Sequence, residues 1–392
     1  MRILHTSDWH LGRTLHGLDL LDHQAMFIDH LVALVSERSV DVVIVAGDVY
    51  DRAVPAVPTV QLLSEALARL SAIATVIVTP GNHDSAVRLG FAAGLMRPGL
   101  HILASIDRLS APVIVDDAAG PVAFYGVPYL DPDTVRARLA RPGSGEPLPR
   151  SHEAVMTAAL DLVRADLGDR VGARSVVVAH AFVVGGAISE SERDIRVGGV
   201  DSVPSEVFDG VDYVALGHLH GPQRVGAADT AAAVHPTIRY SGSPLAFSFG
   251  EMNQVKSSAL VDLAADGTVS VELVPAPVPR RLAEITGDLD DLLDGRYDHL
   301  VDAWLRVFVT DPVHPAQLFA RVTEQFPHAL VIQHTPVGAV ATAVRRAVTA
   351  ETDPLEVAAD FVDFATGGPV SAAEIAVIET AYESALAAEV SA

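Results

Sequence analysis

The sequence contains no cysteine, so the chain can form no disulfide and can offer no thiolate to a metal ion. Zinc fingers and iron–sulfur clusters are therefore excluded, and any metal must be held by nitrogen and oxygen donors. No apolar run reaches the roughly 18 to 20 residues that a membrane-spanning helix needs. The first residues, MRILHTSDWH, lack the pattern of a signal peptide. These absences predict a soluble, cytoplasmic protein with no membrane partner.

Positive charge is also scarce, with 27 Lys and Arg against 50 Asp and Glu and a formal net charge of −23. Because phosphate neutralisation needs cationic side chains, this balance taken alone argues against nucleic acid as a ligand. Acidic residues nevertheless build metal sites, and a local basic patch or a partner subunit can supply contacts that an average conceals. The net charge therefore argues against DNA as a substrate but does not exclude it.

The 392 residues, 49% of them hydrophobic, are enough for two or three domains. Short β-branched segments alternate with helical patterns, near 22–37, 58–71 and 151–168, which predicts an α/β layered core. Three prolines in PAPVPRR, at 275–281, place a boundary near residue 277. Beyond it, the pattern predicts a small αβ domain with helices near 288–294 and 315–325, and then two helices joined by a Gly-Gly-Pro turn.

Five strand-like segments end in residue types that bind metal ions. The endings hold Asp8 and His10, Asp48 and Asp51, Asn82 to Asp84, His180, and His218 and His220. The carboxyl ends of strands in an open α/β sheet meet at one crevice, so we expect these side chains to lie together. Glycines at 47, 81 and 217 precede the ligands, where unusual backbone angles or a close backbone approach are needed.

Each motif alone is more typical of a capped turn than of a ligand set. Taken together, seven carboxylate, amide and imidazole donors suit two divalent ions of intermediate hardness. Two ions about 3.5–4 Å apart clamp the attacking and leaving oxygens of a phosphoryl displacement. The predicted reaction is therefore phosphoester hydrolysis.

DWH, GDVYD, GNHD, VVAH and GHLH occur in this order and resemble the five motifs of the calcineurin-like metallophosphoesterases. Longer segments, among them HTSDWHLGRTL, GNHDSAVRL and YSGSPLAFSF, resemble the D subunits of bacterial SbcC–SbcD nucleases. The likeness covers the whole chain, strongly to about residue 265 and weakly through 270–350. It implies an α/β fold, a β-sandwich flanked by helices. The implied parts are a nuclease domain at 1–276, a small capping domain that contacts DNA at 277–340, and a helix pair at 353–392 that binds the ATPase subunit.

The resemblance also implies a role for each motif residue. The ligand set is Asp8, His10 and His220 for one ion, Asn82, His180 and His218 for the other, and Asp48 for both. His83 would orient the phosphate or protonate the leaving oxygen, work suited to an imidazole with a pKa of about 6.5. Asp51 and Asp84 would fix the tautomers of ligand imidazoles. Asp51 stands where archaeal relatives carry a second catalytic histidine.

For the whole chain, the resemblance implies a manganese-dependent nuclease of DNA repair, associated with the nucleoid. Its partners would be DNA and a coiled-coil ATPase of the SbcC type, with the chain a homodimer within a heterotetramer. Manganese rests on the family, since imidazole and carboxylate ligands suit manganese, iron and zinc about equally. A stand-alone phosphatase or cyclic-nucleotide phosphodiesterase would use the same site, and an architectural subunit is a third possibility. The small domain and terminal helices favour the nuclease.

Two further features have less defined roles. The SESER segment, Ser189 to Arg193, fits a substrate channel and a solvated loop about equally well. Arginines of the small domain and the segment after it are candidates for phosphate contacts, namely Arg280, Arg281, Arg321, Arg345 and Arg346. His5, His16 and His23 lie close to the first motif, and they are expected either to pack in the fold or to face solvent rather than to join the site.

Overall fold

The computed structural model describes residues 1–140, 146–192, 202–226, 235–336, 354–366 and 370–390. The chain forms two compact units, Met1–Thr335 and Pro336–Ala392. Within these residues, the larger unit contains two six-stranded sheets, one three-stranded sheet and two two-stranded sheets, and the smaller unit contains two helices.

The first large sheet has the order β16-β15-β1-β4-β5-β6. Its strands are β1 (Arg2–Thr6), β4 (Val42–Ala46), β5 (Thr75–Thr79), β6 (Leu100–Ile102), β15 (Ser257–Leu263) and β16 (Val269–Pro275). Strands β1, β4, β5 and β6 run parallel to one another, and β15 and β16 run antiparallel to their neighbours. Strand β4, VVIVA, is buried on both faces, as expected of a continuous apolar run in a covered parallel sheet.

The second large sheet has the order β13-β14-β12-β9-β8-β7. Its strands are β7 (Val113–Asp117), β8 (Gly120–Val127), β9 (Arg174–His180), β12 (Tyr213–Gly217), β13 (Gln223–Val225) and β14 (Thr237–Tyr240). Parallel pairing joins the four central strands, and the two edge strands pair antiparallel.

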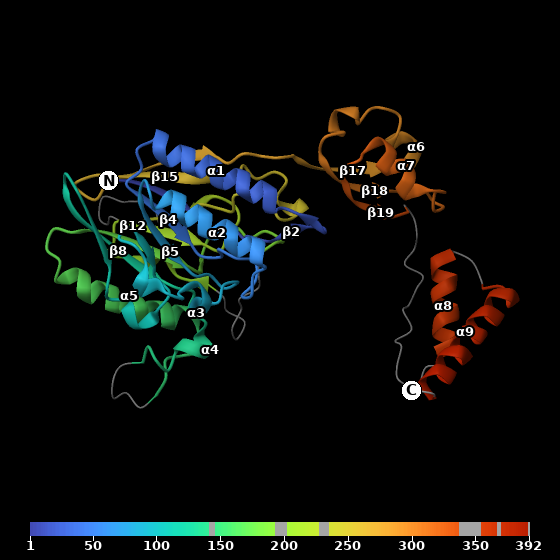
Figure 1. Ribbon diagram of the computed structural model, residues 1–392, viewed down its shortest axis with the longest axis horizontal. Coiled ribbons are helices and arrows are strands. Elements are labelled where there is room, and N and C mark those ends of the chain that lie inside the picture. The colour runs from blue at the N-terminus through green and yellow to red at the C-terminus, as the bar shows by residue number, and fades with distance from the viewer. Residues whose placement is uncertain (141–145, 193–201, 227–234, 337–353, 367–369, 391–392) are drawn as a thin grey trace. The chain divides into compact units, whose positions relative to one another are not determined.

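The two sheets pack face to face around one apolar core, in which Ile44 and Ile77 of the first sheet meet Phe124 and Val178 of the second. Helices α1 (Leu21–Glu37) and α2 (Val57–Leu70) share a second core with the first sheet, and α5 (His152–Gly168) shares a third with the second sheet. Figure 1 shows α1 and α2 on one side of the sandwich and α5 on the other. The predicted fold class and these three predicted helices are confirmed.

The larger unit also contains several short elements. They are the strand pairs β2 (Thr14–Leu15) with β3 (Leu18–Asp19) and β10 (Phe182–Val183) with β11 (Ser202–Val203), the helices α3 (Ala86–Leu89) and α4 (Pro132–Val135), and the 3₁₀ turns Ala93–Leu95, Ile106–Arg108, Ser205–Phe208, Phe249–Glu251 and Asp298–Leu300.

The small sheet consists of three parallel strands, β17 (Leu282–Gly287), β18 (Trp304–Val309) and β19 (Ala329–His334). Helices α6 (Leu289–Leu292) and α7 (Leu318–Gln325) occur where the pattern predicts them. These elements enclose a core of their own, which includes Leu305, Val322 and Phe326. Trp304 packs instead with Leu20, Leu245 and Phe247 of the sandwich. The domain boundaries themselves stay predictions.

The second unit is a pair of helices, α8 (Pro354–Thr366) and α9 (Ala372–Val390). The predicted start of α9 is confirmed, because Ser371 and Glu374 form a reciprocal capping box in which the Ser371 hydroxyl accepts from the Glu374 backbone N–H at 3.3 Å. On the described part of the pair, Phe361 and Val377 are each 68% exposed. No described helix is both long and apolar enough to cross a membrane.

Candidate metal centre

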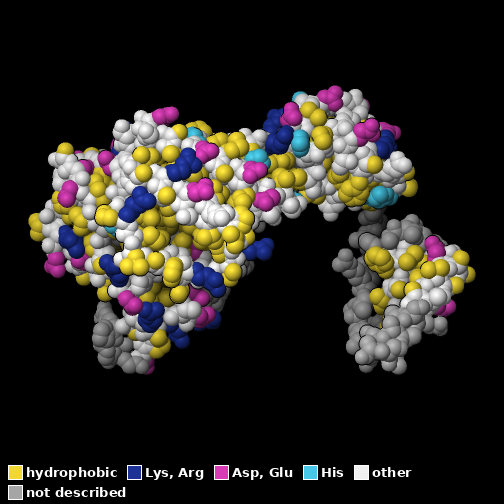
Figure 2. Space-filling model, in the orientation of Figure 1, with side chains coloured by type: hydrophobic (Ala, Val, Ile, Leu, Met, Phe, Trp, Pro, Cys, Tyr) yellow, Lys and Arg dark blue, Asp and Glu magenta, His cyan; other side chains and the backbone are white. Residues whose placement is uncertain are grey.

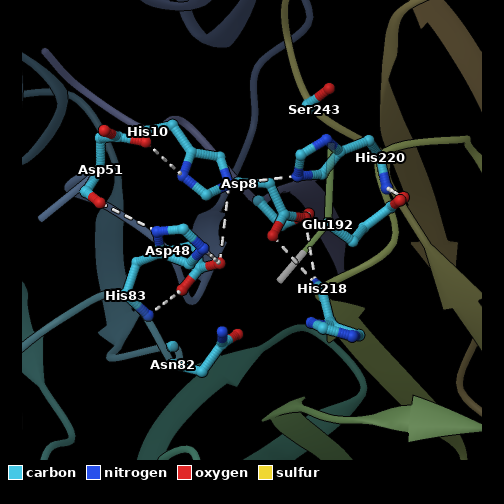
Figure 3. A network of polar contacts seen from close by, with 12 residues as sticks. Asp8, His10, Asp48, Asp51, Asn82, His83, Glu192, His218, His220 and Ser243 are labelled. Atoms are coloured by element: carbon cyan, nitrogen blue, oxygen red, sulfur yellow. Dashed lines mark hydrogen bonds and ion pairs between the residues drawn. The ribbon is translucent and has the colours of Figure 1, made fainter. Parts of the chain in front are cut away.

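The predicted ligands follow strand ends that face a common space (Figure 3). Asp8 and His10 follow β1, Asp48 follows β4, Asn82 and His83 follow β5, His180 ends β9, and His218 and His220 follow β12. Both large sheets therefore contribute, three strands from one and two from the other, in agreement with the β-sandwich that the resemblance implies. The carboxyl ends of the parallel strands in both sheets meet at the same end of the sandwich.

The backbone at the site adopts a conformation that L-residues seldom use. Asp8, His10 and Asp48 have φ of 53°, 43° and 48°, in the left-handed region. Hydrogen bonds between the loop after β1 and the loop after β4 hold this arrangement. They run from the Asp8 N–H to the Gly47 carbonyl at 3.1 Å and from the His10 N–H to the Asp48 carbonyl at 2.9 Å. Such outliers persist where the surrounding structure imposes them, and they concentrate at functional sites.

The three glycines before the ligands permit close approach, as predicted. A Cβ atom at Gly217 would lie 1.8 Å from the Ala46 carbonyl oxygen, and one at Gly81 would lie 2.2 Å from the Asp48 carboxylate. At Gly47 it would lie 2.2 Å from His180 Nδ1. Only Gly47 of the three also has a positive φ, 79°. The neighbouring loops therefore pack so closely that a residue with a Cβ atom would clash at each of these three positions.

Asp48 lies at the centre of the cluster. Its Oδ2 atom is 3.5 Å from His180 Nε2, 3.6 Å from His10 Nε2 and 4.0 Å from His83 Nε2. Its Oδ1 atom accepts the backbone N–H of His83 at 2.9 Å. One oxygen is thus anchored to the chain, and the other faces three imidazoles that come from different strands.

Three groups of side chains could each hold an ion, with ligand atoms within 4.8 Å of one another. The groups are Asp8 with His10 and His220, Asp8 with Asp48 and His180, and His10 with Asp48 and His83. The first contains the three residues predicted for one ion. The other two groups share Asp48, so its carboxylate is within reach of both halves of the cluster.

The trio predicted for the second ion is brought together in part. The Oδ1 atom of Asn82 lies 2.8 Å from His180 Nε2. The rings of His180 and His218 lie edge to face, with centroids 5.4 Å apart, but the imidazole of His218 joins none of the three groups found among the described residues. The backbone N–H of His218 donates to Asp8 at 2.9 Å. His218 therefore lies beside the predicted site, and its backbone N–H helps to hold Asp8, which is a predicted ligand of the other ion.

Burial disfavours charge on these groups. Desolvation lowers the pKa of His10, and the neighbouring His220 lowers it further. Desolvation also lowers the pKa of His180, and it brings that of His218 to about 3. Asp8 has a raised pKa because it is desolvated and close to the charge of Asp48. Neutral imidazoles and closely spaced buried carboxylates form a donor set that a divalent cation would stabilise, so these residues fit the predicted metal.

His83 faces the cluster from the side. Its Nδ1 atom lies 2.9 Å from the carbonyl oxygen of Asp51, which can only accept, so Nδ1 carries the proton. The ring stands edge to face with His10, with centroids 4.6 Å apart, and its side chain is 13% exposed. The Nε2 atom therefore faces Asp48 with a free lone pair while the ring remains accessible.

The prediction that Asp51 and Asp84 both fix imidazole tautomers needs correction. Asp51 does so for His83 through its backbone carbonyl, while its carboxylate lies 3.6 Å from His10 Nδ1. Asp84 accepts the backbone N–H groups of Val49, Tyr50 and Gly81 at 2.9–3.0 Å and forms no hydrogen bond with an imidazole among the described residues. Its carboxylate holds the loop after β4 against the loop after β5.

A set of residues around His220 was not foreseen. Ser191 and Glu251 contact its Nδ1 atom at 2.5 and 3.3 Å, Glu192 accepts its backbone N–H at 2.8 Å, and Lys256 donates to its carbonyl at 3.0 Å. Ser191 and Glu192 belong to the SESER segment, so that segment lies at the site; its last residue, Arg193, is outside the described residues. Glu251 and Lys256 match no motif, and only their isolated charges in an otherwise uncharged region could have drawn notice.

The arginines proposed for phosphate contacts have internal partners. Arg280 and Arg281 donate to the carbonyls of Asp302 and His299, and Arg321 donates to Asp290 at 2.8 Å. Arg345 and Arg346 lie outside the described residues. Of the two environments left open for His5, the structure shows packing between the two large sheets.

Comparison with known families agrees with this geometry. The family model of the calcineurin-like phosphoesterases matches residues 1–222. The chain therefore belongs to the calcineurin-like phosphoesterases, a metal-dependent family of hydrolases. A second family model, the SbcD C-terminal model described as the Type 5 capsule protein repressor C-terminal domain, matches residues 278–366. The two matches together support an SbcD-type nuclease.

Solved structures show more distant likeness. The crystal structure of TT1561 of Thermus thermophilus is 16% identical, with 69% of this chain and 98% of that chain covered and a TM-score of 0.38. GAP50, described as the anchor in the inner membrane complex of Plasmodium, is 11% identical, with 70% and 84% covered and a TM-score of 0.38.

Proposed function

We propose that the chain hydrolyses DNA phosphodiesters at a two-metal site, as the nuclease subunit of an ATP-regulated complex of the SbcC–SbcD type. The observation that carries the proposal is the position of Asp48. Its Oδ2 atom lies within 4.0 Å of imidazole nitrogens of His10, His180 and His83, which follow or end three different strands. This position supports a ligand shared by two ions.

In this proposal the ions are held by seven residues. One ion takes Asp8, His10 and His220, the other takes Asn82, His180 and His218, and Asp48 binds both. Two divalent ions in such a site supply Lewis acidity toward the phosphate and activate a water molecule near neutral pH. Manganese is the proposed ion because of the family, since the ligand types alone do not select it.

His83 is the proposed general acid. The Asp51 carbonyl keeps the Nδ1 proton in place, so Nε2 is the atom that can take up a proton and deliver it to the leaving oxygen. Neither Asp51 nor Asp84 touches the substrate in this scheme. Asp84 instead sets the distance between the loops that carry Asp48 and His83, through its three backbone hydrogen bonds.

DNA and an ATPase subunit are the proposed partners. Support for the substrate comes from the SbcD-type match at 278–366, and support for the partner comes from the exposed apolar residues Phe361 and Val377 on the terminal helices. Figure 2 shows Lys and Arg side chains interspersed with Asp and Glu rather than gathered in one patch on the displayed face. Because the chain has a net charge of −23, we propose that the ATPase subunit supplies much of the DNA contact. The proposed complex is a heterotetramer that contains a homodimer of this chain and is associated with the nucleoid.

A substrate panel tests the proposal. The purified chain is incubated with Mn²⁺ and linear duplex, single-stranded or hairpin DNA, beside a bis-phenyl phosphate ester, with and without an SbcC-type ATPase and ATP. We expect metal-dependent cleavage of DNA. Hydrolysis of the small ester without DNA cleavage, even with the ATPase and ATP present, would favour a stand-alone phosphatase or cyclic-nucleotide phosphodiesterase and refute the nuclease.

A further inference from the structure

His220 is enclosed on the side away from the cluster by two charged residues that are themselves buried. Glu251 and Lys256 are 1% and 4% exposed, and they form an ion pair between Glu251 Oε2 and Lys256 Nζ. Ser191, also buried, lies between Glu251 and the imidazole. Ser191 comes from the SESER segment, and Glu251 and Lys256 come from the stretch between the 3₁₀ turn Phe249–Glu251 and β15, so two separate parts of the sequence meet at one predicted ligand.

The contacts determine which nitrogen of His220 carries the proton. Glu251 accepts the Ser191 hydroxyl proton through Oε1, so the Ser191 oxygen accepts from His220 Nδ1 at 2.5 Å. The same carboxylate oxygen lies 3.3 Å from Nδ1. With the proton held on Nδ1, the Nε2 atom has a free lone pair, and it faces His10 Nε2 at 3.1 Å. Metal-binding histidines depend on such a contact at the other ring nitrogen.

Lys256 acts on the backbone of the same residue. Its ammonium group donates to the carbonyl of His220 at 3.0 Å, to Ser243 Oγ at 2.9 Å and to Gln254 Oε1 at 2.7 Å, in addition to Glu251. The three N–H bonds of an ammonium are thus all engaged. One lysine therefore holds the main chain of His220 directly and its imidazole through Glu251.

We propose that Glu251 and Lys256 are positioning residues for metal binding, which fix the tautomer and orientation of His220 through Ser191. This inference rests on the proposed role of His220 as a ligand of one ion. A buried ion pair contributes little stability beyond that of apolar residues of similar size, so the pair is not accounted for by folding alone. Its contacts converge instead on a single predicted ligand.

Manganese binding tests the inference without reference to catalysis. The full chain is stripped with a chelator and titrated with Mn²⁺ alone, and free Mn²⁺ is followed by electron paramagnetic resonance, which gives the number of sites and their affinities. The variants are Glu251→Gln and Ser191→Ala, with His220→Ala as a reference. Glu272→Gln is the matched control, because Glu272 pairs with Arg38 at an exposed position on the sandwich.

We expect Glu251→Gln to weaken one of the two sites by about 10- to 100-fold, the usual effect of losing an outer partner of a ligand, and to leave the other unchanged. Ser191→Ala should weaken the same site, and Glu272→Gln neither. Thermal melts followed by circular dichroism check folding. An unpaired Lys256 could destabilise Glu251→Gln. The double variant Glu251→Gln with Lys256→Met, which removes both charges of the pair, is therefore measured beside it and should show the same loss.

Two sets of results would contradict the inference, and they can be told apart. If His220→Ala weakens a site while the folded double variant and Ser191→Ala bind Mn²⁺ like the unchanged chain, the positioning role is wrong and the proposed function stands. If the unchanged chain binds no Mn²⁺, or His220→Ala binds it normally, the metal assignment of the proposed function is wrong and the inference fails with it.

Discussion

His5 should make the fold sensitive to mild acid, to an extent that its contacts allow us to calculate. The ring lies in the sandwich, with Nδ1 2.9 Å from the Tyr213 hydroxyl and Nε2 3.1 Å from the Leu216 carbonyl, which satisfies a neutral imidazole. Burial lowers its pKa from 6.5 to about 3. Because the folded state disfavours the charged form, stability is full above pH 6.5 and is lost as the pH falls toward 3.

At pH 5, the difference between the unfolded pKa and the pH is about 1.5 units, or about 2 kcal/mol of unfolding free energy at 1.36 kcal/mol per unit. Urea unfolding at pH 7 and pH 5 measures the change for the unchanged chain and for His5→Gln. Glutamine can accept from Tyr213 and donate to Leu216 but cannot be protonated in this range.

We therefore expect the stability difference between the two proteins to shift by about 2 kcal/mol in favour of His5→Gln on going from pH 7 to pH 5. The exposed His299 gives the control, since His299→Gln should leave the pH dependence unchanged. A stability difference between His5→Gln and the unchanged chain that stays constant from pH 7 to pH 5 would refute the reasoning.

Four other changes address the site and the terminal helices. Asp48→Asn should lower bound Mn²⁺, measured by metal analysis after dialysis, and abolish hydrolysis; full activity would contradict a shared ligand. His83→Ala should keep its metal and lose turnover by about 10²- to 10⁴-fold in a single-turnover assay, as expected for a general acid, and loss of both would make it structural. Gly217→Ala, whose Cβ would lie 1.8 Å from a backbone carbonyl, should lower the melting temperature, whereas Gly168→Ala, with open space, should not. Deletion of 353–392 should abolish co-purification with the ATPase subunit while sparing Mn²⁺-dependent cleavage of single strands.

Much of the site could be predicted because strand ends impose a local pattern. Asp8 with His10 and His218 with His220 are pairs spaced two residues apart, and each spacing, like the glycines before the predicted ligands, involves only a few adjacent residues. Such local features indicate which side chains lie together at the carboxyl end of a strand. The structure brings Asp8, His10 and His220 together as predicted. The capping box at Ser371 was predictable for the same reason, since it depends only on residues three apart.

The rest depends on which strands pair, and periodicity does not specify pairing. The alternation of strands and helices suits one open sheet as well as two stacked ones, so the second sheet that contributes β9 and β12 was implied by the family resemblance and not by the pattern. Asp84 was assigned an imidazole partner, but its partners are backbone N–H groups, which no residue type indicates. Glu251 and Lys256 reach His220 only through the return of the chain into β15.

The left-handed backbone of Asp8, His10 and Asp48 has a consequence for the evolution of the fold. Each such residue costs about 1–3 kcal/mol, and glycine would adopt the same angles at little cost. Substitution of any of the three by glycine therefore removes both a ligand and a local strain, so some inactive descendants of this chain should be more stable than the active one. Selection for function, rather than for stability, is then what retains charged and aromatic side chains at these three positions.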